Sequence, residues 1–228
     1  MILKILFTVL GFFARLFCKP YRDLWLIMER GNDARDNGYW FFRYLREEHP
    51  EINCAYVITD DSIDRERVSS IGRTITYKSP EHYLAYYSAK YLLSTHVQPC
   101  APDLILHYHL AKYGIRPGGK EVFLQHGIIK DEMQWLWRKN LHVDMFVCGA
   151  KPEYDYIKKV YGHPEGVVRY TGLCRFDNLI KAGEPDKMIL VMPTWRGSGY
   201  PSGSDFVNTA YYKSFQGLLN SRVLDGKL

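Results

Sequence analysis

The sequence lacks an apolar stretch long enough to cross a membrane as a helix. Its longest uncharged apolar run covers residues 5–14 and has ten residues, whereas a membrane-spanning helix needs about 20. No small-x-small cleavage site follows this run, so a cleaved secretory signal is not indicated. The amino-terminal segment therefore needs another explanation than a membrane span or a leader.

Cysteine is scarce, and no cluster of metal ligands is visible. The five cysteines are odd in number, widely spaced and set mostly among apolar neighbours, and they are Cys18, Cys54, Cys100, Cys148 and Cys174. This pattern favours reduced thiols in a cytosolic setting over a disulfide framework or a CxxC metal site. His107 and His109 would point to the same side of a strand, but no third ligand follows at a recognisable spacing, so no metal is expected.

No nucleic-acid-binding module is recognisable either, and we expect no nucleic-acid partner. The net charge of +5 and the isoelectric point near 8.8 suit an anionic substrate or an anionic membrane surface. With 228 residues and 46% hydrophobic content, the chain can bury at least one core. Length alone allows one large domain or two small ones.

Short apolar runs alternate with helical patterns along most of the chain. Strands are expected at residues 24–28, 52–59, 91–94, 122–124, 143–148, 167–170 and 188–192, and helices from about 39 to 48, from Ser79-Pro80, from Lys151-Pro152 to about 161, and at 208–219. Residues 103–109 are another apolar segment. This alternation predicts an α/β fold with a mostly parallel, doubly wound sheet.

The first 20 residues combine apolar side chains with cations such as Lys4, Arg15 and Lys19. This composition favours an interfacial helix whose cations reach lipid headgroups. The alternative is a helix that caps the core of its own domain. With a polar Gly-Pro linker at residues 181–187, the expected division is 1–20 (membrane-associating), 21–183 (first Rossmann-like domain) and 184–228 (the beginning of a second domain).

Residues 121–131, EVFLQHGIIKD, carry the strongest functional pattern. A buried strand ends in Gln125 and His126, Gly127 is expected to let the backbone turn, and Lys130 would add positive charge one helical turn later. Ligands of open α/β sheets bind outside the carboxyl ends of the strands. A histidine there can take a proton from a hydroxyl near neutral pH. The alternative is a polar strand cap bonded to a neighbouring carbonyl, and the spacing does not choose between them.

Arginines follow three other expected strands, namely Arg30, Arg175 and Arg196. Each taken singly is explained by a surface ion pair, for instance Arg30 with Asp33. If the strands are parallel, however, these arginines and His126 line one edge of a sheet or face each other across two sheets. Because guanidinium groups bind phosphate oxygens in a bidentate fork, the set together indicates phosphate chemistry.

Four segments also carry a resemblance to a known family. They are WLIMERGNDARDNGY at 25–39, QHGIIKD at 125–131, TGLCRFD at 171–177 and MPTWR at 192–196. In this order they resemble the CDP-glycerol glycerophosphotransferases of teichoic-acid and capsule-polymer synthesis in the cell wall. The resemblance implies a GT-B architecture of two Rossmann-like domains, the second incomplete here, peripheral attachment to the cytoplasmic membrane face, and no cofactor. The implied reaction transfers glycerol phosphate or a related polyol phosphate from a CDP-linked donor to a hydroxyl of a lipid-linked polymer, releasing CMP.

The resemblance also implies roles for individual residues. His126 would be the general base. The acceptor side would be formed by Arg30, Asn32, Asp33, Arg35, Asp36, Asn37, Gly127 and Lys130, and the donor side by Arg175, Asp177, Thr194, Trp195 and Arg196.

The family pattern continues beyond the position of Leu228 with a second histidine and a nucleotide-binding stretch, so much of the donor site is expected outside this sequence. A fragment or shortened copy with weak or no activity is therefore expected. A non-catalytic membrane-associated binding module and a GT-B glycosyltransferase that uses a nucleotide sugar are the alternatives.

Overall fold

The computed structural model describes residues 6, 9–11, 13–14, 18–97, 100–180 and 208–219. The chain divides into two compact units, residues 1–183 and 184–228. In the second unit the described residues include one helix, α8 (Ala210–Leu219). The expected strand at 188–192 lies outside the described residues.

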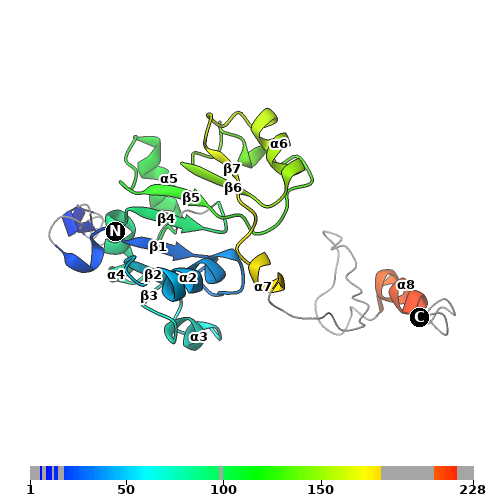
Figure 1. Ribbon diagram of the computed structural model, residues 1–228, viewed down its shortest axis with the longest axis horizontal. Coiled ribbons are helices and arrows are strands. Elements are labelled where there is room, and N and C mark those ends of the chain that lie inside the picture. Colours follow the sequence, from blue (N-terminus) through cyan, green and yellow to red (C-terminus); the bar gives the residue numbers. More distant parts are fainter. Residues whose placement is uncertain are drawn as a thin grey trace. The chain divides into compact units, whose positions relative to one another are not determined.

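The first unit is built on a seven-stranded sheet in the order β3-β2-β1-β4-β5-β6-β7 (Figure 1). Every neighbouring pair is parallel. The strands are β1 (Trp25–Met28), β2 (Cys54–Ile58), β3 (Thr74–Thr76), β4 (Tyr91–Ser94), β5 (Lys120–Phe123), β6 (Met145–Cys148) and β7 (Val168–Tyr170). The sheet grows from β1 first to one side and then to the other, so the predicted doubly wound architecture is confirmed.

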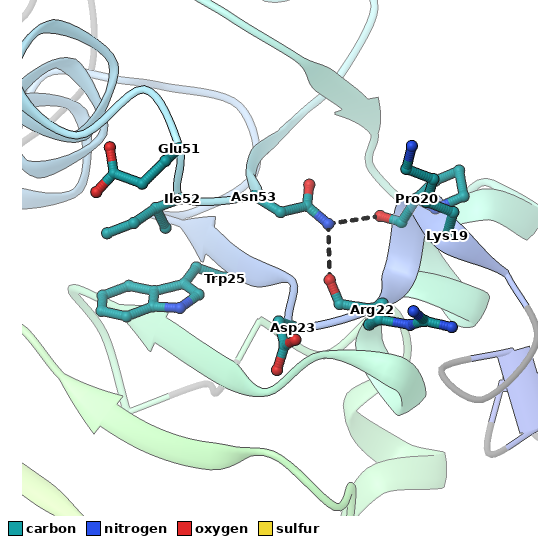
Figure 2. Close-up of a pocket in the computed structure, with 8 residues that line it drawn as sticks. All are labelled: Lys19, Pro20, Arg22, Asp23, Trp25, Glu51, Ile52 and Asn53. Carbon is teal, nitrogen blue, oxygen red and sulfur yellow. Dashed lines mark hydrogen bonds between the residues drawn. The ribbon is translucent and has the colours of Figure 1, made fainter.

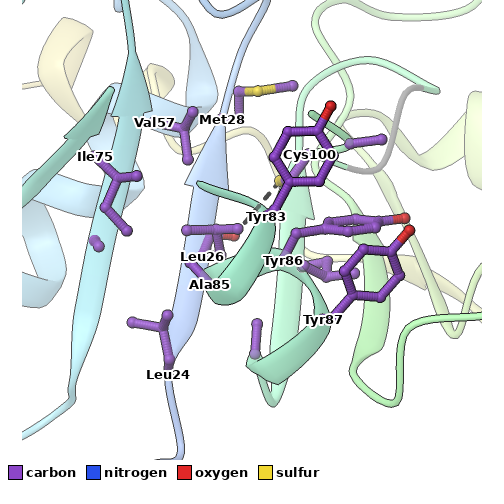
Figure 3. Packing of buried hydrophobic residues seen from close by; sticks show 14 residues of the cluster. Leu24, Leu26, Met28, Val57, Ile75, Tyr83, Ala85, Tyr86, Tyr87 and Cys100 are labelled. Carbon is purple, nitrogen blue, oxygen red and sulfur yellow. Dashed lines mark hydrogen bonds between the residues drawn. The ribbon is translucent and has the colours of Figure 1, made fainter. Parts of the chain in front are cut away.

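Helices cover both faces of this sheet. They are α2 (Asn37–Glu48), α3 (Arg65–Ser69), α4 (Pro80–Ser88), α5 (Leu104–Lys112), α6 (Lys151–Val160) and α7 (Phe176–Ile180), with short 3-10 turns η1 (Lys19–Tyr21) and η2 (Gln134–Leu136). Successive strand side chains point to opposite faces, so Ile27 packs with Phe42 of α2 while Leu26 packs with Tyr86 of α4 (Figure 3). Helices α4, α5 and α6 share one face, and α2 and α3 lie on the other.

Helix starts follow the expected capping chemistry. Ser79 caps α4 by accepting from the backbone N–H of His82, with Pro80 as the first helical residue. Asp36 caps α2 by accepting from the N–H of Asn37. Side-chain oxygens at these positions satisfy N–H groups that have no partner within the helix. The cap of α2 matters most here, because it places Asp36 and Asn37 at the carboxyl edge of the sheet.

The segment with paired histidines is a helix, α5, and not a strand. Residues two apart on a helix do not share a face. His107 is buried and its Nδ1 lies 2.7 Å from the hydroxyl of Tyr86, whereas His109 is exposed. Within the residues that the structure describes, no group of three or more His, Cys, Asp or Glu side chains could hold a metal ion.

The amino-terminal segment packs on α4 through its small residues. Gly11 and Ala14 are buried, and the Ser88 hydroxyl donates to the Gly11 carbonyl at 2.6 Å. A Cβ atom at position 11 would lie 2.7 Å from the Cβ of Tyr87, so only glycine allows this approach. The described large apolar side chains of this segment face outward and are exposed, and they are Leu6, Val9, Leu10 and Phe13. Among the described helices, none combines the length and the apolar character needed to span a membrane.

Candidate functional site

Four polar side chains follow strands of the sheet at its carboxyl edge. Arg30 follows β1, His96 follows β4, His126 follows β5 and Arg175 follows β7. This edge includes the point between β1 and β4 where the direction of sheet growth reverses, and such switch points are where open α/β sheets bind ligands. The side chains of Arg30, His96 and His126 contact one another in that order, and the Arg175 side chain bonds the backbone carbonyl of His126.

His96 and His126 form a stacked pair. Their ring centroids are 4.6 Å apart and their planes differ by 3°. The Nε–H of Arg30 donates to Nε2 of His96 at 3.0 Å. Because a guanidinium only donates, this Nε2 carries no proton, so the His96 proton sits on Nδ1, 2.9 Å from the hydroxyl of Thr95. His96 is therefore neutral with a fixed tautomer.

The surroundings of His96 keep it neutral. Burial, together with the nearby His126 and Arg30, lowers the pKa of His96 to about 4. A neutral ring beside His126 matters because two stacked imidazolium cations would repel each other. His126 can therefore accept a proton without a positive charge on its neighbour.

His126 presents an unprotonated nitrogen to solvent. Its Nδ1 lies 3.0 Å from the carbonyl oxygen of Thr95. A carbonyl only accepts, so Nδ1 carries the proton and Nε2 holds the lone pair. Within the described part of the chain Nε2 has no hydrogen-bond partner, and the residue is exposed. The bond to a neighbouring carbonyl that was expected of a polar strand cap is present at Nδ1. The role of His126 as a base stays a prediction, and Nε2 is the nitrogen that would carry it.

Arg175 is fastened to the start of α2 and to the His126 loop. Its Nη1 donates to Asp36 Oδ1 and to the carbonyl oxygen of His126, each at 2.9 Å. Its backbone N–H donates to Asn37 Oδ1 at 3.1 Å. Asn37 is fully buried and its Nδ2 donates to the carbonyl of Gln125 at 2.6 Å. This clamp joins the ends of β1, β5 and β7.

The loop after β1 is folded around a buried carboxylate, Glu29. Its oxygens accept backbone N–H groups from Arg35 at 2.8 Å and from Asp36 and Tyr39 at 2.9 Å. Burial raises the pKa of Glu29 to about 7 in spite of these three donors, which favour the charged form. Glu29 thus sets the path of the residues that carry Arg30 and Asp36.

The expected acceptor-side residues divide into two groups. Arg30, Asp36 and Asn37 contact the histidine pair or the clamp. Other residues of the same loop bond elsewhere: the Asn32 carbonyl accepts from Ser62, Asp33 accepts from the Arg30 backbone, and Arg35 pairs with Asp64. The structure therefore brings part of the predicted set to the histidines, and the rest shape the loop.

The expected turn at Gly127 has a different basis in the structure. The left-handed residue is Gln125, with φ of 64°, whereas Gly127 has no positive φ and a Cβ there would meet open space. Residues 126–133 form no helix, so Lys130 does not lie one helical turn after His126. Lys130 is exposed.

The left-handed conformation of Gln125 is uncommon for a residue other than glycine, and such residues often mark a functional segment.

The expected donor side is only partly described. Arg175 belongs to the clamp, whereas Asp177 is exposed on α7 and lines an apolar pocket of about 460 Å³ on the sheet face beside α2. Thr194, Trp195 and Arg196 lie outside the described residues.

Sequence reasoning did not select His96 or Glu29 as site residues. His96 follows the correctly predicted strand at residues 91–94 by two positions, and His126 follows β5 by three. That placement after a buried strand was the available signal. Glu29 carried a weaker signal, since it directly follows the first strand and begins the polar loop.

A larger open pocket, about 660 Å³, lies at the opposite edge of the sheet (Figure 2). It is lined by Lys19, Pro20, Arg22, Asp23, Trp25, Glu51, Ile52 and Asn53. Figure 2 shows the Asn53 side chain bonded to the Pro20 and Arg22 carbonyls. The lining holds equal numbers of cations and anions, so this pocket has no electrostatic preference for an anion. The carboxyl edge remains the candidate site.

Comparison with known proteins points to one family. The model of CDP-glycerol:poly(glycerophosphate) glycerophosphotransferases matches residues 11–222. The minor teichoic acid biosynthesis protein GgaB of Bacillus subtilis (strain 168) is 30% identical over 220 residues, which cover 89% of this chain and 24% of GgaB. The chain thus spans about a quarter of that relative.

Solved structures of the wall teichoic acid polymerase TagF share the fold. One matches with a TM-score of 0.51 and 12% identity over 89% of this chain and 58% of TagF. A TagF variant with CDPG matches with a TM-score of 0.51 and 11% identity over 78% of this chain and 51% of that one. The parallel sheet of the first unit has the expected GT-B-like form. With its match over residues 11–222, this chain belongs to the CDP-glycerol:poly(glycerophosphate) glycerophosphotransferase family.

Proposed function

We propose that the protein transfers glycerol phosphate, or a related polyol phosphate, from a CDP-linked donor to a hydroxyl of a lipid-linked teichoic-acid-like polymer. The observation that carries the proposal is the unprotonated Nε2 of the exposed His126 at the carboxyl edge of the sheet. The His126 ring stacks on His96, which holds Arg30, and the His126 carbonyl accepts from Arg175. Family membership supplies the donor class.

In the proposed reaction, His126 is the general base. The acceptor hydroxyl gives its proton to Nε2 of His126 while its oxygen attacks the phosphorus that carries the polyol. The bond from that phosphorus to the bridging oxygen breaks, and CMP leaves with the electron pair. General base catalysis of this kind contributes about 10²- to 10⁴-fold in rate.

The cations stabilise the charge that spreads over the phosphoryl oxygens. Arg175 stands beside His126 and is held in place by Asp36, so it costs no reorganisation when charge develops. CMP is already an anionic leaving group, which makes positive charge more useful than a general acid.

Peripheral attachment to the cytoplasmic face of the membrane is part of the proposal. The amino-terminal segment is fixed to α4 through Gly11 while Leu10 and Phe13 stay exposed. An apolar surface flanked by cations such as Lys19 binds anionic bilayers by burial and by charge.

The direct test is release of CMP from CDP-glycerol in the presence of a lipid-linked polyol-phosphate acceptor. The expected result is acceptor-dependent CMP release that His126→Ala reduces by about 100-fold or more. An intact, folded protein that releases no CMP would contradict the activity. Equal rates for wild type and His126→Ala would instead contradict the role of this histidine, and His96→Ala measured alongside shows which imidazole takes the proton.

A further inference from the structure

Arg30 differs from Arg35 and Arg175 in the kind of group that its side chain contacts. Arg175 pairs with Asp36, and Arg35 pairs with Asp64. In the described part of the chain the Arg30 side chain is bonded instead to the neutral ring of His96, and it has no carboxylate partner. A carboxylate partner offsets part of the field of a guanidinium, whereas a neutral imidazole acceptor leaves that charge uncompensated.

The bond to His96 also selects which edge of the guanidinium is free. Nε is occupied at 3.0 Å, so the two terminal nitrogens, Nη1 and Nη2, remain to bind a ligand. A pair of N–H groups in this fork matches two oxygens of a phosphate. Arg30 is exposed, which makes the fork accessible.

The His96 ring lies between the Arg30 guanidinium and the proposed base, His126. His96, which holds Arg30, lies against His126 with 4.6 Å between ring centroids. A ligand that reaches both must carry a phosphate and a hydroxyl a short distance from each other. The terminal unit of a polyol-phosphate chain has this arrangement.

Taking the proposed function as its basis, we infer that Arg30 binds the phosphate of the terminal acceptor unit and that His96 is the residue that positions it. The site then selects acceptors that end in a polyol phosphate over acceptors that end in a neutral polyol or sugar. The hydroxyl of the same terminal unit lies at Nε2 of His126. Specificity for a charged end thereby resides in the residue pair Arg30 and His96.

The first test is binding of glycerol 3-phosphate and of glycerol to the protein, measured by calorimetric or NMR titration. Wild type should bind glycerol 3-phosphate at least about tenfold more tightly, as expected for charge-assisted hydrogen bonds. Arg30→Gln should abolish this preference. The control Arg43→Gln removes an exposed arginine that pairs with Glu47 on α2, and it should leave the preference unchanged.

Two substitutions of His96 separate positioning from folding. His96→Phe keeps a ring against His126 but cannot accept from Arg30, so the preference for glycerol 3-phosphate should fall several-fold. His96→Gln offers an amide oxygen as acceptor and should restore most of it. Glycerol binding and the melting temperature should be similar in both, which a purely structural role of His96 would not give.

Several outcomes overturn the inference. Retention of the preference in Arg30→Gln would do so, as would identical behaviour of His96→Phe and wild type. Weaker binding of CDP-glycerol with unchanged binding of glycerol 3-phosphate in Arg30→Gln would assign Arg30 to the donor.

The transfer assay distinguishes this inference from the proposed function. Equal CMP release with phosphate-ended and neutral-ended acceptors would remove the selectivity and leave the transferase intact. A protein that releases no CMP but still prefers glycerol 3-phosphate in an Arg30-dependent way would contradict the transferase activity and leave the selectivity of Arg30 intact.

Discussion

The side-chain oxygen of Asn37 accepts the backbone N–H of Arg175 at 3.1 Å, across 138 positions of the sequence. The other end of the same amide donates to the carbonyl of Gln125. One buried side chain therefore holds the loops that carry His126 and Arg175, and its contacts account for how a base and a cation from distant strands share one edge.

Replacing Asn37 with alanine leaves a buried N–H and a buried carbonyl without partners. We expect the free energy of unfolding to fall by about 2 kcal/mol, as for other buried groups that lose their hydrogen bonds. Urea unfolding measures this. Asn140→Ala is the matched control, since Asn140 makes an exposed bond to the Gln134 carbonyl at 2.8 Å and should cost less than about 0.5 kcal/mol. Equal losses in the two variants would contradict the clamp.

Replacing His126 should remove turnover without removing the fold. His126→Gln should lower acceptor-dependent CMP release by about 10²-fold or more, because the amide cannot take the proton. The melting temperature should change little, since the ring is exposed. His109→Gln, at an exposed position on α5, is the control. A His126→Gln variant with the wild-type rate would show that another residue is the base.

Glu29 should make stability depend on pH. Its folded pKa, about 7, lies above the ordinary value of 4.5 because of burial. The folded state therefore holds the proton more tightly, and the stability this contributes is full below about pH 4.5 and is lost as pH rises toward 7. The loss is up to about 3 kcal/mol, since one pKa unit corresponds to about 1.4 kcal/mol.

The measurement is urea unfolding of wild type and Glu29→Gln at pH 5 and pH 7.5. Glutamine does not titrate, so the difference between the two proteins should shrink as pH rises. The glutamine should be the less stable protein at pH 5, because its NH₂ group replaces an oxygen that accepts from a backbone N–H. A pH-independent difference would show that Glu29 does not change protonation on folding in this range.

The amino-terminal segment should bind anionic vesicles. The double substitution Leu10→Glu and Phe13→Glu places two negative charges on its exposed side and should weaken vesicle co-sedimentation several-fold. Salt should weaken wild-type binding as well, because it screens the cations. Ile63→Glu is the control, since Ile63 is 83% exposed just before α3. Equal recovery of wild type in the supernatant with and without vesicles would contradict membrane attachment.

The sequence predicted most of the sheet because buried strands and helix caps are local patterns. Residues 91–94 and the Ser79-Pro80 helix start were located within a residue. Among the elements that the sequence did not predict, two have a clear physical reason. Strand β3 has three residues and is defined by its pairing with β2, and α5 was obscured by its apolar composition, although Asp103 caps it by accepting from the N–H of Leu106.

The sequence could predict which site residues follow a strand, but not the contacts among them. His126, Arg30 and Arg175 could be selected because each follows a strand. The state of His96 could not, since it depends on Arg30, 66 positions away, and on a stack with His126. Which nitrogen carries a proton is decided by partners that only the folded sheet brings together.

The order of the strands also determines when the site can exist during synthesis. A nascent chain released only as far as α6 already contains both imidazoles and Arg30, but the seventh strand and the guanidinium that follows it are still in the ribosome. Asn37 has no partner for its oxygen until then, and long-range contacts of this kind form late. The newborn polypeptide would thus complete the candidate site only after nearly all of the first unit has been made.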